Sequence, residues 1–430
     1  MSPYKQFVCV SIAVAAAWQV PAQAAPPAPS AEMDALELKS EPEPAATQAN
    51  ADGRHSVEVA AGTMARRYGL GSASVRRVSL DLFQAFRLGT NVRAVISNRT
   101  DHLRPDSSAT PGAPDTLNSL REAYISWDLP QQQSVVEFGR INLRQGQGYG
   151  YNPTDFFRDH ALRSVVSVNP SALRENRLGT VMLRLQRSWE DGSLSLSLAP
   201  KLSDSTSNSG TSLALGATNY RNRVMATLNH RFSDRVSAQL SLYKEPKRSA
   251  QFGASASALI SDSLVAFGEW SLANAPTLAS SAGLTNEQRR GSRFVAGFTY
   301  TTPGKLSLTS EVQASQFALG DNEWTRVVAD PRALGAYLLL AEQMQDLASR
   351  RAYLVHVSQK DFLLRGLDLS GFVRINAFDH SRLSWLELRH HWSSIDVALQ
   401  WQQAAGKSFS QYGFSPEKTV TQLLVSYHFR

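Results

Sequence analysis

The sequence predicts an all-β protein, a transmembrane antiparallel β-barrel, and three observations lead to this fold class. An export signal opens the chain, apolar and polar residues alternate through many segments of strand length, and short turns alternate with long connections. Each observation alone leaves other folds open. Together they are typical of barrels that cross an outer membrane on tilted strands.

The first 53 residues are expected to lie outside the barrel. Lys5 precedes an apolar run from Phe7 to Trp18, and small residues follow at Ala22-Gln23-Ala24, so residues 1–24 are interpreted as a signal peptide. The run is too short for a membrane-spanning helix, which needs about 20 residues. Residues 25–53 are rich in Ala, Pro and Glu and are predicted to form a disordered periplasmic leader.

Composition narrows the class of the remaining chain. Hydrophobic residues make up 42% of the sequence, the mean hydropathy is −0.26, and no later stretch is long and apolar enough for a transmembrane helix. The single cysteine, Cys9, lies in the signal, so the mature chain is expected to lack disulfides and cysteine-bound metals. We expect no metal site and no cofactor, and nucleic acid is not an expected partner.

Alternation is most regular near the end of the chain. From position 421 onward, Leu423, Val425, Tyr427 and Phe429 share one face, and polar residues occupy much of the other. Similar segments recur upstream with lengths of about 9 to 12 residues, which suit a tilted strand that crosses a membrane. A soluble sandwich also alternates, so the connections between the segments provide the second test.

Short turns and long connections alternate along the chain. The long connections predicted from the sequence cover residues 99–118, 143–177, 201–220, 273–290, 318–349 and 403–419. This asymmetry fits short periplasmic turns and long external loops. Counting both kinds predicts about 18 strands within residues 54–430, with 16 as the alternative, and it places the protein in the cell outer membrane after secretion to the periplasm.

One stretch differs from a simple connection. A strand ends at Gly139-Arg140, and glycines then follow at Gly146, Gly148 and Gly150, before Asn152-Pro153-Thr154-Asp155. This segment resembles one found in porin-like outer-membrane barrels of the alginate-export and related superfamily. The resemblance implies that the loop after the strand, residues 143–177, folds into the barrel lumen.

We therefore predict that this loop forms a pore constriction. Glycine lets the backbone turn inward and pass close to the wall, so Gly146, Gly148, Gly150, Asn152 and Pro153 are assigned to shaping the loop. The predicted constriction and selectivity residues are Arg140, Arg144, Asp155, Arg158, Asp159, Arg163 and Arg174. The glycines lack the Gly-Lys-Ser/Thr sequence of a phosphate-binding loop, which argues against nucleotide binding.

A second loop has helical character. Asp330-Pro331 is a good helix start, and apolar residues recur near helical spacing after it, so residues 318–349 are predicted to contain a helix. Such a helix could cap the channel or only pack over its rim.

The barrel region carries an excess of positive charge. The formal charge is +7, removal of the signal with Lys5 leaves +6, and removal of Lys39 and the six acids of residues 25–53 leaves about +11. Arginines that face water in a pore attract anions. The alternative is that these arginines pair with acids of the lumen, such as Glu137, Glu269 and Glu311, and brace the wall.

The sequence leaves several functions open. The leading hypothesis is a monomeric porin-like channel for passive passage of small anionic solutes. The first alternative is an export channel for an anionic polysaccharide. The second is a barrel enzyme or a structural assembly platform, although the histidines show no diagnostic arrangement with a nucleophile, so no catalytic residue and no enzyme activity are predicted.

The expected partners follow from this location. They are outer-membrane lipids, including lipopolysaccharide, the barrel-assembly machinery, and a small anionic solute or a polymer. The last strand resembles the terminal strand that the assembly machinery recognises, with Tyr427 and Phe429 at alternate positions. These two residues are assigned to the assembly signal.

Overall fold

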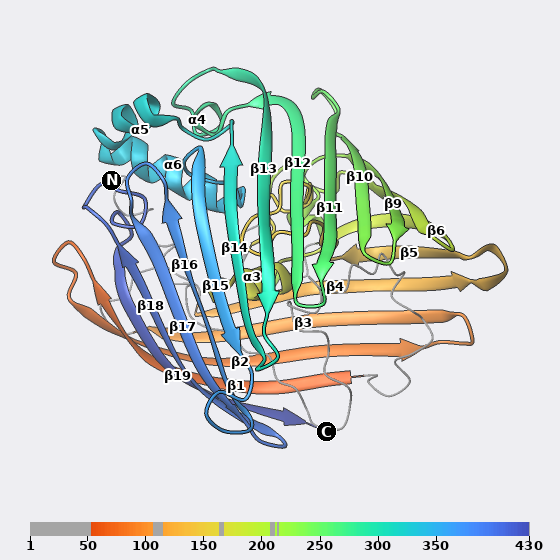
Figure 1. Ribbon diagram of the computed structural model, residues 1–430, viewed down its shortest axis with the longest axis horizontal. Helices are drawn as coiled ribbons and strands as arrows, with labels where there is room; N and C mark the ends of the chain where they lie inside the picture. The colour runs from red at the N-terminus through yellow and green to blue at the C-terminus, as the bar shows by residue number, and fades with distance from the viewer. Residues whose placement is uncertain (1–52, 106–114, 163–166, 207–210, 213–214, 430) are drawn as a thin grey trace.

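The computed structural model describes residues 53–105, 115–162, 167–206, 211–212 and 215–429. Strands form a single sheet that curves back on itself, as Figure 1 shows. The signal peptide and nearly all of the predicted leader lie outside the described residues.

Eighteen long antiparallel strands make a closed barrel, which confirms the predicted fold class and strand number. The first nine are β1 (Gly53–Arg66), β2 (Ser72–Arg87), β3 (Val92–Pro105), β4 (Thr116–Leu129), β5 (Ser134–Ile141), β6 (Thr180–Trp189), β7 (Gly192–Ala199), β9 (Arg223–Ser233) and β10 (Val236–Lys244). The other nine are β11 (Gln251–Ser261), β12 (Leu264–Pro276), β13 (Gln288–Thr301), β14 (Leu306–Ser315), β15 (Arg351–Gln359), β16 (Leu367–Asn376), β17 (Arg382–His391), β18 (Ile395–Ala405) and β19 (Glu417–Phe429). The two-residue strand β8 (Thr211–Ser212) lies in a connection and pairs in parallel with β4.

The first and last strands close the ring. β1 pairs with β19 in antiparallel register, from His55 opposite Phe429 to Thr63 opposite Thr421 and beyond. Closure leaves neither strand with a row of unpaired backbone groups, which a lipid environment could not satisfy. Phe429 and Tyr427 both point outward, and their rings meet edge to face with centroids 5.2 Å apart.

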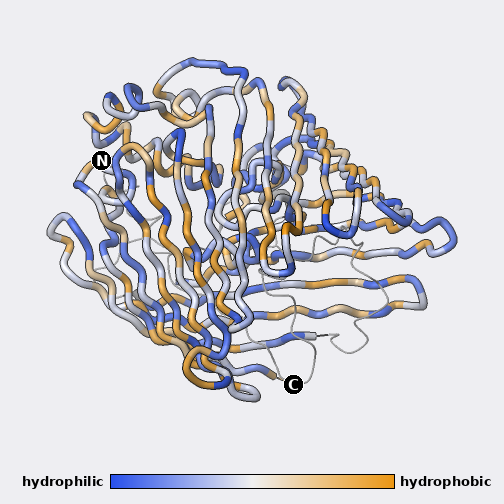
Figure 2. Tube along the Cα trace, viewed as in Figure 1, coloured by the Kyte–Doolittle hydropathy of each residue, from blue (hydrophilic) through white to orange (hydrophobic). Residues whose placement is uncertain are grey.

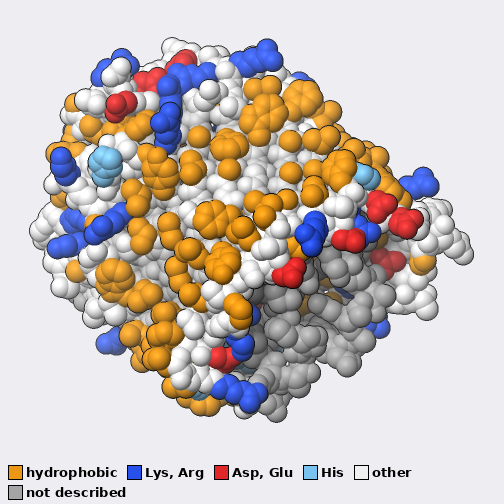
Figure 3. All heavy atoms as spheres, in the orientation of Figure 1, with side chains coloured by type: hydrophobic (Ala, Val, Ile, Leu, Met, Phe, Trp, Pro, Cys, Tyr) orange, Lys and Arg blue, Asp and Glu red, His pale blue; other side chains and the backbone are white. Residues whose placement is uncertain are grey.

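Alternate residues face opposite sides of the wall. On β12, for example, Trp270 is exposed on the outer side whereas its neighbour Glu269 is buried on the inner side. Hydrophilic and hydrophobic residues alternate along most strands in Figure 2. Figure 3 shows many hydrophobic side chains across the outer face of the barrel, with most of the charged ones near its edges. A period of two residues thus produces an apolar exterior and a polar interior.

The two ends of the barrel differ in their connections. One end has only short connections, at 88–91, 130–133, 190–191, 234–235, 262–263, 302–305, 360–366 and 392–394. The other end carries the long ones, although 67–71, 245–250 and 377–381 are short there too. The strands also extend farther into several long connections than the sequence predicts. For example, residues 99–118 were predicted as a connection, but β3 reaches Pro105 and β4 begins at Thr116.

Four α-helices and two 3-10 turns, η2 (Pro130–Gln132) and η3 (Leu215–Thr218), are described within the connections. The α-helices are α3 (Pro170–Glu175), α4 (Leu278–Ser281), α5 (Asp321–Val328) and α6 (Pro331–Gln343). Asp330 accepts a hydrogen bond from Arg332 N and so caps α6, as the sequence suggested. None of the described helices has the length and hydrophobicity that a membrane crossing requires.

The helices α4, α5 and α6 gather at the long-loop end, where Figure 1 shows them together. Leu334 and Tyr337 of α6 are fully buried, and they pack with Leu278 of α4 and Val295 of β13. Tyr151, from the connection between β5 and β6, belongs to the same apolar cluster. The helical loop is therefore packed against the loop that was predicted to fold inward.

Candidate functional site in the barrel lumen

The connection between β5 and β6, residues 142–179, is described at 142–162 and 167–179, and these parts lie inside the ring of strands. Gln145 donates from Nε2 to Thr227 Oγ1 of β9 at 3.1 Å, and the ring of Tyr149 stacks on that of His356 of β15, with centroids 4.2 Å apart. Both partners are inward-facing. Since β15 is nearly opposite β5 in the order of the sheet, this loop extends most of the way across the lumen.

Glu269 of β12 is the first anchor of the loop. Its Oε1 accepts hydrogen bonds from Gly148 N at 2.6 Å and from Asn152 Nδ2 at 3.1 Å. Its Oε2 accepts from Thr154 N at 3.2 Å and from Thr154 Oγ1 at 2.8 Å. Hydrogen bonds to a charged group are each worth about 1.5–3 kcal/mol, so this one carboxylate holds a large part of the loop.

Glu311 of β14 is the second anchor. Its carboxylate accepts a hydrogen bond from Tyr149 N, and its Oε2 accepts from Gly150 N at 3.0 Å and from Gln313 Nε2 at 2.7 Å. The sequence assigned Glu269 and Glu311 only to possible arginine pairing. In the structure both bind the main chain of the loop.

Two glycines allow this close approach. A Cβ at Gly146, whose φ is +97°, would lie 2.5 Å from Glu269 Oε2, and one at Gly150 would lie 2.4 Å from Leu354 Cδ1. Any other residue at Gly146 would also be strained at this φ. Gly146 is thus required by its contact with the Glu269 carboxylate, and Gly150 is required by its contact with Leu354 of the wall.

The two ends of the loop are tied together near the wall. Arg177 NH1 donates to Asp155 Oδ2 at 2.7 Å, and Arg177 Nε donates to Asn142 Oδ1 at 2.8 Å. Arg121 of β4 donates to Asn176 Oδ1 at 2.6 Å. Asp155 was predicted to act on a permeating ion. In the structure it is buried, and its carboxylate forms an ion pair with Arg177.

Asp346, just after α6, joins the loop to the helical loop. It accepts hydrogen bonds from the Tyr151 hydroxyl at 2.5 Å and from Arg293 Nε at 2.7 Å, and Arg158 NH2 lies 3.7 Å away. Burial alone would raise the pKa of Asp346, but the charges of Arg293 and Arg158 outweigh it and lower the pKa to about 2. Arg158 is itself buried in this contact.

Asp159 is held by a separate group of cations. Arg221 and Arg223 both form ion pairs with it, the latter at 3.3 Å, and the Tyr220 hydroxyl also donates to it. Burial alone would raise the pKa of Asp159, but Arg221 and Arg223 hold it below its usual range. The neighbouring His160 has a lowered pKa because it is largely desolvated.

Two arginines of the loop remain without an acidic partner within the described part of the chain. Arg144 is exposed, and Arg174, on α3, is half-buried and donates from NH2 to Gln145 O at 3.1 Å. Burial lowers the pKa of Arg174. The charge of Asp155 acts in the opposite direction, but burial together with repulsion from Arg177 and Arg144 outweighs it. The loop therefore presents two arginines beside α3 that form no ion pair with a described acid.

The remaining predicted residues lie elsewhere. Arg140, the last but one residue of β5, is fully buried and donates from NH1 to Leu120 O at 3.0 Å, so it belongs to the wall. Asn152 donates to Gly148 O at 2.6 Å as well as to Glu269, which keeps the glycine segment folded. Pro153 is buried beside it. Arg163 lies outside the described residues.

A dense ionic network covers the inner face of β1 to β3. Glu58 pairs with Arg77 and, at 3.0 Å, with Arg99, which also donates to Asp101 Oδ1 at 3.0 Å. Arg99 NH1 lies 3.2 Å from Asp81 Oδ2, and Asp81 in turn pairs with Arg121. In this region Arg77, Arg99 and Arg121 pair with acids of the wall, which is the alternative role that the sequence left open for the arginines.

Comparison with known proteins identifies the fold. No protein-family model and no curated protein matches the chain. Among solved structures, OccAB1 of Acinetobacter baumannii aligns over 88% of this chain and 96% of its own, with a TM-score of 0.55 and 11% identity. OccK9 (OpdG) of Pseudomonas aeruginosa covers 88% and 98%, with a TM-score of 0.54 and 12% identity. The Occ/Opd proteins are outer-membrane porins, so this chain has a porin fold.

Proposed function

We propose that the protein is a monomeric outer-membrane channel for passive passage of small anionic solutes, with the loop 142–179 as its constriction. The observation that carries the proposal is the placement of Arg144 and Arg174. They lie on a loop that Glu269 and Glu311 fix inside the lumen, and no described acid pairs with them. A positive charge in a narrow passage acts strongly on a passing ion because little water screens it.

The outer-membrane location has its own support. The apolar exterior, the closed wall and the porin fold all suit a chain inserted in lipid. Tyr427 and Phe429 remain our proposed signal for the assembly machinery. The finer resemblance to the alginate-export superfamily rests on the segment from Gly139 to Asp155 alone.

The selectivity of the channel tests the proposal. In planar bilayers under a salt gradient, we expect the wild type to favour anions, and Arg144→Ala with Arg174→Ala to shift the reversal potential toward that of a cation channel. The matched control is Arg235→Ala, since Arg235 is exposed on the short turn between β9 and β10, far from the loop along the strands.

The same measurement can contradict the proposal. A wild-type channel without anion preference, or a double variant with an unchanged reversal potential, would remove these arginines from the permeation path. Arg158→Ala should affect selectivity less than the double variant does, because its charge is already paired with Asp346.

A further inference from the structure

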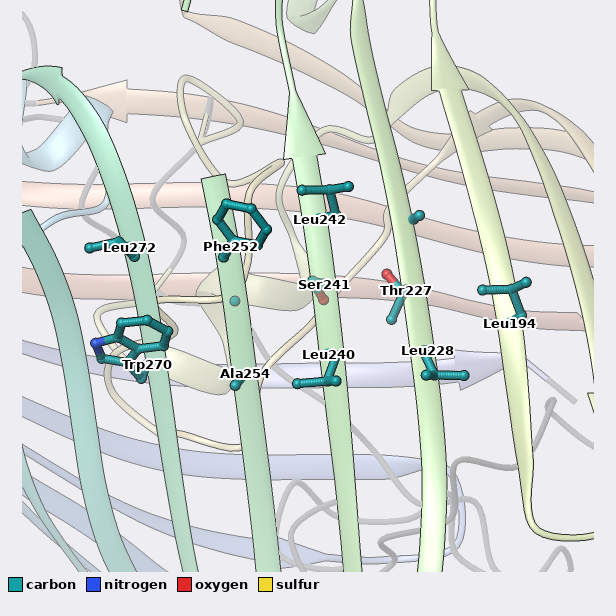
Figure 4. A pocket seen from close by; sticks show the side chains of 12 residues that line it. Leu194, Thr227, Leu228, Leu240, Ser241, Leu242, Phe252, Ala254, Trp270 and Leu272 are labelled. Atoms are coloured by element: carbon teal, nitrogen blue, oxygen red, sulfur yellow. The ribbon is translucent and has the colours of Figure 1, made fainter. Parts of the chain in front are cut away.

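An apolar groove crosses the outer face of the barrel over β7 and β9 to β12. Its volume is about 490 Å³, and Figure 4 shows the residues that line it side by side on these strands. Large exposed side chains form its rim, among them Leu240, Leu242, Phe252 and Trp270. Ala226 and Ala254 lie between them.

The cross-strand register explains the hollow. Ala254 is paired with Leu240 on one side and with Trp270 on the other, and Ala226 is paired with Leu242. Neighbours across a sheet stand side by side on one face, so a small residue between two large ones leaves a depression.

The wall behind the groove is packed from inside. Thr227 accepts the hydrogen bond from Gln145, and Gly253 is so close to the loop that a Cβ there would lie 3.2 Å from the ring of Phe156. The strands therefore cannot move inward to close the depression. The groove is a fixed feature of the outer surface.

Positive charge stands directly above this groove. On β10 the outward side chains run from Leu240 through Leu242 to Lys244, which is exposed at the long-loop end. Lys247 follows in the connection and is also exposed. Within the described residues neither lysine forms an ion pair, although Lys244 Nζ donates a hydrogen bond to Arg248 O, and Arg248 pairs with Glu245 at 2.9 Å. At about 3.4 Å per residue, Lys244 lies about 7 Å above Leu242 and about 14 Å above Leu240.

We propose that this groove binds an anionic, phosphate-bearing lipid, with one acyl chain between Leu240 and Trp270 and its phosphate at Lys244 and Lys247. This lipid site goes beyond the proposed function, and it rests on that proposal for the location of the barrel in a membrane. The order of the features along β10 matches a lipid, because the charged head group lies at the membrane surface and the chain lies below it.

Quenching of tryptophan fluorescence tests the site directly. The full mature protein is inserted into lipid nanodiscs that contain phosphatidylglycerol or phosphatidylcholine with brominated acyl chains, and the signal of Trp270 is obtained by difference from Trp270→Phe. We expect stronger quenching of Trp270 by the anionic lipid. Lys244→Ala with Lys247→Ala should weaken that preference about 30-fold, since each cation near an anionic surface contributes about fivefold.

Two further variants define the outcomes. Ala254→Phe should fill the groove and reduce quenching by both lipids, whereas Lys407→Ala, an exposed lysine in the connection between β18 and β19, should change nothing. Equal quenching by the two lipids in the wild type would overturn the proposal, and so would protection of Trp270 by dimer formation. Failure to insert into nanodiscs would instead contradict the outer-membrane location.

Discussion

The inner face of β1 to β3 and that of β12 to β14 satisfy buried carboxylates in two different ways. In the first region, Glu58 is neutralised by Arg77 of the neighbouring strand, and Asp101 is neutralised by Arg99 of its own strand. In the second, Glu269 and Glu311 accept hydrogen bonds mainly from the main chain of the loop 142–179. The first arrangement is complete within the wall, and the second requires a segment from the other side of the barrel.

This difference separates two roles for lumen charge. An arginine that is paired within the wall stiffens the wall and offers little net field to a solute, since its charge is cancelled close by. A carboxylate that is satisfied by backbone N–H groups fixes the position of a loop without using any cationic side chain. Arg144 and Arg174 therefore remain outside any ion pair with a described acid, since the nearby carboxylates already bind the loop or Arg177.

The largest effect is expected when both loop anchors are removed. Glu269→Gln with Glu311→Gln takes away the charge that orders the glycine segment, so the loop should leave its position and single-channel conductance should rise severalfold with frequent fluctuations. Glu137→Gln is the matched control, because Glu137 pairs with Arg184 on neighbouring strands at 2.8 Å. If the double variant conducts like the wild type, the loop is held by its apolar contacts and the comparison between the two regions fails.

Removing an arginine from the ionic network of β1 to β3 should lower the thermal stability of the barrel and leave its conduction nearly unchanged. Arg99→Met leaves Glu58 and Asp101 with less compensation, and loss of one member of a buried ionic group costs about 3–5 kcal/mol. We expect earlier unfolding of the barrel on heating in detergent, measured by circular dichroism, with little change in reversal potential. A large shift in selectivity at unchanged stability would show that this network faces the permeation path.

The strands could be predicted because they depend on a local pattern, whereas the inward course of the loop was expected from a resemblance and from its glycines. Alternation such as Leu423, Val425 and Tyr427 marks a strand whatever it pairs with, and glycines after Gly139 indicate a backbone that turns closely. The partners of that backbone could not be predicted. Glu269 and Glu311 lie more than a hundred positions away, and only the register of the closed barrel brings them to Gly148 and Gly150.

The same limit applies to the arginines. Sequence treated Arg140, Arg158 and Arg174 alike, since each stands in or beside the loop. Tertiary contacts distinguish them: Arg140 is buried in the wall, and Arg158 is paired with Asp346, a residue of another loop. The helix in residues 318–349 showed itself in the sequence through Asp330-Pro331, but its contact with Tyr151 did not.

Acid provides a smaller test, directed at Asp346. Because its pKa is lowered from 3.8 to about 2 in the folded protein, its contribution to stability is fully present above about pH 4 and is lost as the pH falls toward 2. The difference in conductance fluctuations between Asp346→Asn and the wild type should therefore stay constant down to about pH 4 and disappear below it. Asp346→Asn should fluctuate already at neutral pH. If this difference already disappears near pH 6, another group controls the loop, such as His160 or the anchor Glu311.

The smallest effect is expected for Tyr151→Phe, which removes the hydroxyl and keeps the ring, so that their two contributions can be measured separately. The ring should keep its place in the apolar cluster with Val295 and Leu334, and only the hydrogen bond to Asp346 is lost. Asp346 would still accept from Arg293, so it is not left unpaired, and the cost should be about 1 kcal/mol. We expect fluctuations between those of the wild type and Asp346→Asn. Equality with Asp346→Asn would mean that the hydroxyl carries the link and that the arginines contribute only charge balance.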